Sequence, residues 1–118
     1  DTLLAASNYA NSLFGLQRFK EGKTLVRKMI PVARRVLGET DRLTLNMRWA
    51  YAGALYMDEA ATLDDLREAV TKLEDAERTA RRVMGGAHPL AAKIELNLRM
   101  ARAALRAREQ PSDDEEDA

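Results

Sequence analysis

Few side chains in this sequence could carry out catalysis or hold a metal. His88 is the only histidine, and it stands between Ala87 and Pro89, a context typical of a helix start. The candidate acids form two groups, which we expect at a turn and at a helix start, where negative charge is favoured: Asp58 and Glu59, then Asp64, Asp65 and Glu68. They lack the pattern of a calcium loop, and no glycine-rich phosphate loop is present. We therefore expect no enzyme activity, metal or cofactor.

Basic side chains form two stripes along predicted helices. They are Arg27, Lys28, Arg34 and Arg35 in the first stripe, and Arg99, Arg102 and Arg106 in the second. Such stripes can bind nucleic acid. However, the net charge is zero, aromatic residues make up only 5% of the chain, and the second stripe neighbours an acidic run. Solvated helix faces are the better interpretation, and we expect no nucleic-acid partner.

The elements that must position these side chains belong to one small domain of 118 residues. The absence of cysteine excludes a disulfide scaffold and thiolate metal sites. The longest uncharged apolar stretch, Trp49 to Met57, is about half the length that a membrane-spanning helix needs, so we expect no membrane insertion. No signal peptide is recognisable, which favours a cytoplasmic location, and the first residue, Asp1, indicates that the natural N-terminus is missing.

Charge is unevenly distributed along the chain. Residues 1–57 hold nine basic and four acidic side chains, whereas residues 58–118 hold ten basic and fifteen acidic ones. The acidic excess includes the run from Asp113 to Asp117, which offers nothing apolar to bury. We expect residues 109–118 to form a disordered acidic tail, either a solubilising end or a docking tail for a basic partner.

Apolar residues recur at three- and four-residue steps in five segments, which predicts five helices. Their expected ranges are 2–16, 20–37, 42–57, 63–84 and 89–108. Asp41 and Thr62 are suited to cap helix starts, Pro89 to the first turn, and Gly38 to a helix end. The third helix is apolar nearly all round, so neighbours should cover it on several sides. Pro31 should kink the second helix.

The segments repeat in pairs. Val36-Leu37-Gly38 matches Val83-Met84-Gly85 at an offset of 47, and Tyr9-Ala10 matches Tyr51-Ala52 at an offset of 42. The two offsets differ by five residues, which places an insertion in the turn of the second hairpin, near residues 58–62. The chain is therefore expected to be all-α, with hairpins over about 2–37 and 42–84 and a final helix over about 89–108, arranged as a repeat array over 1–108.

The string from Ala5 to Gly38, AASNYANSLFGLQRFKEGKTLVRKMIPVARRVLG, resembles one repeat of the kinesin light chain type of tetratricopeptide repeat (TPR) protein. His88-Pro89 resembles the pair that opens the next repeat, and Asp1-Thr2-Leu3 resembles the residues directly after such a pair. The resemblance covers about residues 1–105 and implies a TPR-like superhelix of two hairpins and a capping helix, with further repeats upstream. The family usually has a small residue where the two helices of a hairpin pack together, and in the final helix of this chain that position is Arg99. A charged residue there suits a capping helix with no following partner.

In such arrays the first helix of each hairpin lines a concave surface, where side chains hold an extended peptide. Carried over to this sequence, the positions implied as partner-binding are Leu4, Ser7, Asn8, Asn11, Asn46, Trp49, Gly53, Lys93, Asn97 and Met100. Amides would satisfy the peptide backbone, and the indole of Trp49 would fill an apolar pocket. Alternatively, Trp49 and Asn8 only complete contacts between adjacent helices.

The resemblance implies a non-catalytic scaffold or adaptor that binds a protein or peptide, with the positive N-terminal half favouring acidic sequences. One alternative is a structural subunit, or the repeat end of a larger assembly, with an empty groove. Another is fusion to an upstream catalytic domain.

Overall fold

The computed structural model describes residues 2–110 and consists of five α-helices with no strand in that range. They are α1 (Thr2–Gly15), α2 (Phe19–Val36), α3 (Arg42–Met57), α4 (Leu63–Met84) and α5 (Pro89–Glu109). The all-α class is confirmed, and every helix begins and ends within one residue of its predicted bounds. Helix α5 includes Glu109, which the sequence pattern assigns to the tail, and the acidic run from Asp113 to Asp117 lies outside the described residues.

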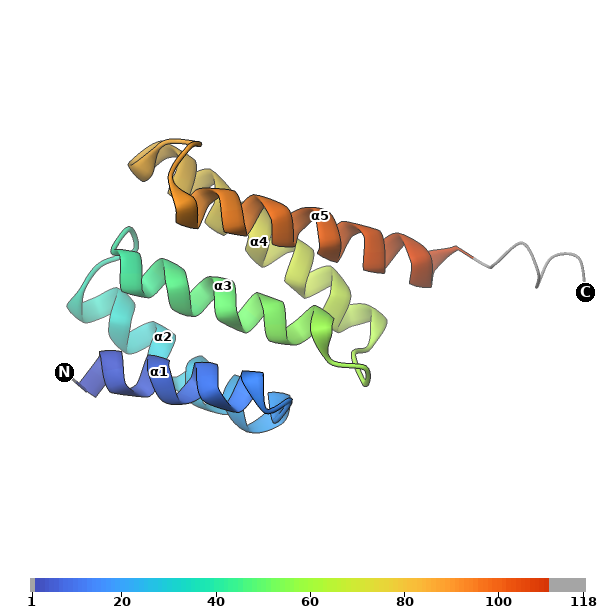
Figure 1. Ribbon diagram of the computed structural model, residues 1–118, viewed down its shortest axis with the longest axis horizontal. Helices are drawn as coiled ribbons and strands as arrows, with labels where there is room; N and C mark the ends of the chain where they lie inside the picture. The colour runs from blue at the N-terminus through green and yellow to red at the C-terminus, as the bar shows by residue number, and fades with distance from the viewer. Residues whose placement is uncertain (1, 111–118) are drawn as a thin grey trace, which may run out of the picture.

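The helices form two layers with consecutive helices antiparallel. In Figure 1, α1, α3 and α5 lie side by side and point the same way, while α2 and α4 lie behind them. Each helix packs against the next along the chain, and α3 also packs against α1 and α5. This alternation places one helix of each pair in the front layer, so the architecture is repeat-like.

Local side-chain hydrogen bonds explain where three helices start. Asp41 accepts from the backbone N–H of Leu43 at 2.9 Å. At the start of α4 a full capping box forms, because the Thr62 hydroxyl accepts from the backbone N–H of Asp65 at 3.1 Å and the Asp65 carboxylate accepts from that of Thr62 at 3.0 Å. His88 Nδ1 accepts from the backbone N–H of Leu90 at 3.1 Å, so its observed role is that of a helix cap.

Helix ends follow from backbone conformation. Gly38 and Gly85 have φ of 98° and 87°, a region that other L-residues adopt only at a cost. Gly85 directly follows the last residue of α4, and Gly38 follows the last residue of α2 after Leu37. Pro31 does not interrupt α2, which continues through it to Val36.

The core is centred on α3. Leu45, Met47 and Leu55 of this helix are almost completely buried, together with Leu73 of α4 and Ile94 of α5. The prediction that neighbours cover α3 on several sides is confirmed, because α3 contacts all four other helices. A central helix held in this way gives the side chains on both of its sides fixed positions.

Candidate functional site

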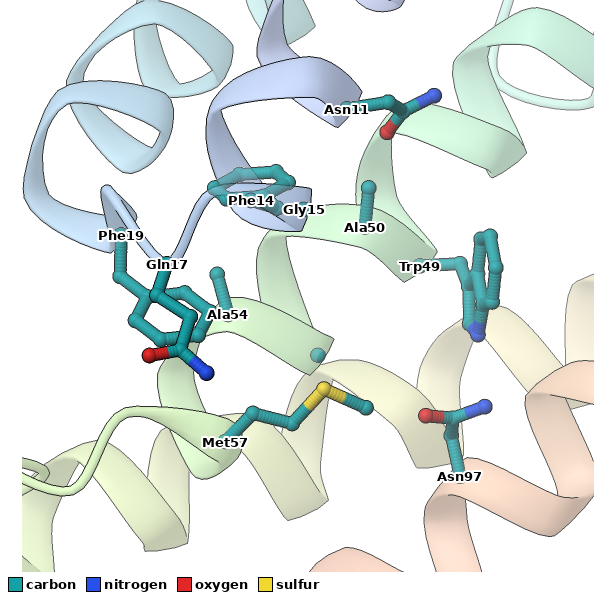
Figure 2. A pocket seen from close by; sticks show the side chains of 11 residues that line it. Asn11, Phe14, Gly15, Gln17, Phe19, Trp49, Ala50, Ala54, Met57 and Asn97 are labelled. Carbon is teal, nitrogen blue, oxygen red and sulfur yellow. The ribbon is translucent and has the colours of Figure 1, made fainter.

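A hollow of about 390 Å³ opens between the turn of the first hairpin, α3 and α5. Its walls are mostly apolar, with amides at its margins, and none of the lining side chains is charged. In Figure 2, Trp49 and Asn97 lie on one side, Phe14, Gln17 and Phe19 lie on the other, and the side chain of Met57 reaches between them. The full lining comprises Asn11, Phe14, Gly15, Gln17, Phe19, Trp49, Ala50, Gly53, Ala54, Met57 and Asn97.

The aromatic wall depends on the turn between α1 and α2. Gln17 adopts φ of 62°, and the backbone N–H of Arg18 donates to the carbonyl of Leu13 at 2.8 Å, which reverses the chain tightly. The rings of Phe14 and Phe19 then stack with centroids 6.4 Å apart. Gly22 makes room for this arrangement, because a Cβ at that position would lie 2.3 Å from the Phe14 ring. The turn and Gly22 together position the wall.

The floor of the hollow is open at Gly53. A Cβ built at this position would meet no atom within 4 Å, although the glycine lies inside α3. Glycine in a helix interior costs roughly 1 kcal/mol relative to alanine. The helix therefore gives up stability at a point where a larger side chain would have entered the hollow.

Trp49 supplies the one polar group of the hollow that is buried without a partner among residues 2–110. Its ring packs against the core, and the ammonium of Lys93 lies 5.9 Å from the ring centroid, within range of a cation–π interaction. The indole Nε1 is shielded from solvent and has no acceptor within the same residues. An unpaired buried donor costs about 1–3 kcal/mol, so a ligand acceptor that meets Nε1 after a shift of the ring towards the hollow would be bound favourably. The ring as a whole is half-buried.

Asn97 is held in place by hydrogen bonds at both ends of its amide. Nδ2 donates to the backbone carbonyl of Lys93 at 2.8 Å, and Oδ1 accepts from the hydroxyl of Tyr56. Burial raises the pKa of Tyr56, so this hydroxyl keeps its proton at neutral pH. Because Tyr56 uses one lone pair of the amide oxygen and Lys93 one amide N–H, Asn97 can offer a ligand its remaining N–H and the second lone pair of Oδ1.

The structure brings four of the ten predicted partner-binding residues together in this hollow: Asn11, Trp49, Gly53 and Asn97. The other six do not line it. Lys93 contacts the Trp49 ring, and the sulfur of Met100 lies 3.9 Å from the Tyr56 hydroxyl oxygen. Leu4 and Asn8 are exposed, and Asn46 is half-buried. Ser7, expected on the open surface, is instead buried, because its side of α1 faces the protein interior.

Sequence reasoning missed the apolar side of the hollow, formed by Phe14, Phe19 and Met57. The spacing of apolar residues in the first helix predicts that Phe14 packs against other residues. It assigns no role to Phe19 or Met57. The close spacing of two phenylalanines and two glycines between Phe14 and Gly22 is the signal that could have indicated an unusual turn.

Comparison of the chain with protein-family models, with curated proteins and with solved structures finds no match. Among residues 2–110, no group of three or more acidic or histidine side chains is arranged to hold a metal ion. None of the five helices is both long and apolar enough to cross a bilayer.

Proposed function

We propose that this chain is a non-catalytic protein-interaction module of the TPR type, a scaffold or adaptor that binds a peptide in the hollow between α1, α3 and α5. The observation that carries the proposal is the combination of an unfilled apolar space at Gly53 with the unpaired Nε1 of Trp49 beside it. The open space at Gly53 suits an apolar side chain, and the N–H of Trp49 suits a backbone carbonyl. A peptide offers both within one residue.

The TPR assignment is supported by the internal offset of 42 residues and by the alternation of helices between two layers. The kinesin light chain type remains a resemblance of the string 5–38. The proposed preference for acidic partners depends on charges outside the hollow, such as that of Lys93 beside Trp49. Long-range attraction of this kind speeds association more than it tightens binding.

The single tryptophan provides the test, because its fluorescence reports on the hollow. Peptides selected from a displayed random library should carry an apolar residue and should shift the Trp49 emission. Gly53→Leu, which fills the open space, should abolish their binding. Ala103→Leu, a comparable enlargement at an exposed position of α5 outside the hollow, should leave binding unchanged.

The separation of Asn8 from the hollow gives a second comparison. We expect Trp49→Ala to remove peptide binding, measured by calorimetry, and Asn8→Ala to retain it, because Asn8 is exposed and does not line the space. Peptides that bind Gly53→Leu as tightly as the parent chain would exclude the hollow as the binding site.

The alternative function, a structural repeat end within a larger assembly, is favoured by a different observation. Leu4, Tyr9 and Leu16 of the first hairpin are large apolar side chains that remain exposed. They would suit burial against another helix. Under this alternative, Tyr9→Ser would break the assembly, whereas Gly53→Leu would leave it intact.

A further inference from the structure

A second hollow, of about 220 Å³, lies between α2 and α4 on the other side of α3 from the peptide hollow. Its lining includes four cationic side chains, Arg27, Arg34, Arg48 and Lys72, and a single carboxylate, that of Glu68. Their formal charge is therefore +3, in a chain whose net charge is zero. A local excess of this size in a concave site attracts anions.

Two of the charged groups, Arg27 and Glu68, are already bonded to the hydroxyl of Tyr51. Arg27 donates to the hydroxyl of Tyr51 at 2.8 Å, and this hydroxyl donates to the carboxylate of Glu68 at 3.2 Å. Arg27, Tyr51 and Glu68 all line the hollow. The cations that remain available to a ligand are Arg34, Arg48 and Lys72, and all three also line the neighbouring hollow towards Arg78.

Arg48 is the unusual member, because its side chain is only 5% exposed. Its Nη2 donates to Asp75 at 3.0 Å, which holds the guanidinium in place. Its Nη1 makes no hydrogen bond within residues 2–110 and lies 3.7 Å from the nearest Glu39 oxygen, too far for one. A buried charged donor without an acceptor is costly, so this site favours any anion that can reach Nη1.

Glu39 shows how an anion fits. This residue belongs to the loop between α2 and α3, and its two carboxylate oxygens lie 3.0 Å from Nε of Arg34 and 3.7 Å from Nη1 of Arg48. The carboxylate thus satisfies one arginine and falls short of the other. Its side chain is 61% exposed, so it can turn into solvent when a ligand replaces it.

We propose that the hollow between α2 and α4 binds a phosphate group, which displaces Glu39 and bonds to Arg34, Arg48 and Lys72. Lys72 is an exposed residue, and its ammonium has no ion pair within the described part of the chain. A carboxylate has two oxygens, whereas a phosphate monoester has three terminal oxygens, one for each of the three cations. Its charge near −2 also matches the +2 that remains when the Asp75 carboxylate, bound to Arg48, is counted with the three cations. This site is independent of the proposed peptide hollow.

The test is an NMR titration of the ¹⁵N-labelled chain with inorganic phosphate, at an ionic strength held constant with chloride. Shifts should saturate and centre on the amides around Arg34, Arg48 and Lys72. Lys72→Gln should weaken phosphate binding on the order of tenfold, because a charged hydrogen bond is lost. Lys28→Gln removes the same charge from α2 outside both hollows and should change the affinity less than about twofold.

Glu39→Gln should act in the opposite direction and tighten phosphate binding severalfold, because it removes the competing carboxylate. Glu59→Gln, the same change at an exposed turn residue, is its matched control and should leave the affinity nearly unchanged. These four exposed positions avoid substitution of Arg48 itself, whose loss would remove a buried side chain and its hydrogen bond to Asp75 and so destabilise the fold.

Three results would overturn the proposal: shifts that do not saturate, equal losses in Lys72→Gln and Lys28→Gln, or acetate binding as tightly as phosphate. Phosphoserine within a short peptide, titrated in the same way, separates the two sources of the group. Tighter binding of the phosphopeptide than of inorganic phosphate assigns the site to a phosphorylated side chain. Equal or weaker binding assigns it to a free phosphate compound.

Discussion

Tyr9 and Tyr51 occupy matching positions in the first helices of the two hairpins, 42 residues apart, yet Tyr9 is 59% exposed and Tyr51 only 4% exposed. The difference follows from the neighbours of each helix. Tyr51 bonds to Arg27 of α2 and Glu68 of α4, which flank α3 on both sides. Helix α3 packs against two helices of the second layer, α2 and α4, whereas within the described chain α1 packs against only one of them, α2. Two residues at matching positions of the repeat therefore contribute differently to the stability of the fold.

The first prediction compares these two hydroxyl groups. Tyr51→Phe should lower the free energy of unfolding by about 1–3 kcal/mol, because Glu68 loses its donor and Arg27 its acceptor in a partly buried site. Tyr9→Phe should change it by less than about 0.5 kcal/mol, as an exposed substitution does. Urea unfolding followed by circular dichroism measures both. Equal losses would contradict the assignment of the Tyr51 network.

The second prediction compares two helical glycines that sequence alone does not distinguish. Gly53→Ala should stabilise the fold by up to about 1 kcal/mol, because the new Cβ meets open space and alanine favours the helix. Gly22→Ala should destabilise it by about 1–3 kcal/mol, because the Cβ would lie 2.3 Å from the Phe14 ring. Thermal unfolding of the pair gives the signs directly. A stabilised Gly22→Ala variant would show that Phe14 moves aside without cost.

Helix positions could be predicted well because their signals are local. Asp41, Thr62 and Pro89 act within one turn of their own helices, so a short stretch of sequence determines where each helix begins. The two-layer arrangement was accessible through the repeat offset. The exposure of Tyr9 was not, because the repeat assigns it the surroundings of Tyr51, and only the arrangement of neighbouring helices reveals the difference.

The candidate site could be predicted only in part for a related reason. Trp49, Gly53 and Asn97 were identified because they lie on the helix faces that the resemblance implied. The opposite wall depends on the backbone of Gln17 and on the contact of Phe14 with Gly22, and a contact between two helices leaves no periodic signal in the sequence. Side-chain bonding also escaped prediction, because no spacing in the sequence indicates that Tyr56 occupies the Asn97 amide oxygen.

The third prediction concerns the helix cap formed by His88. His88→Ala should cost about 1 kcal/mol of stability, because the backbone N–H of Leu90 loses its acceptor at the start of α5. His88→Asn should recover most of this loss, since asparagine caps helices well. If alanine is tolerated without loss in urea unfolding, the imidazole makes no useful cap.

The fourth prediction concerns alkaline pH and links stability to the peptide hollow. Burial raises the pKa of both Tyr51 and Tyr56, and at Tyr51 the hydrogen bond from Arg27 opposes part of the increase. A pKa raised in the folded state contributes stability that is present below the unfolded value of about 10 and is lost as the pH rises through the folded value. Unfolding free energies measured by urea denaturation should therefore fall above about pH 10.

The variant that isolates this effect is Tyr56→Phe, which should show a shallower alkaline decline than the parent chain. Tyr9→Phe removes an exposed tyrosine and should keep the full decline. Ionised Tyr56 can no longer donate to Asn97 Oδ1 and instead places negative charge against that oxygen, so the amide beside Trp49 must move. Trp49 emission should then change together with tyrosinate absorbance in the parent chain. An alkaline decline equally steep in Tyr56→Phe would show that other groups destabilise the fold.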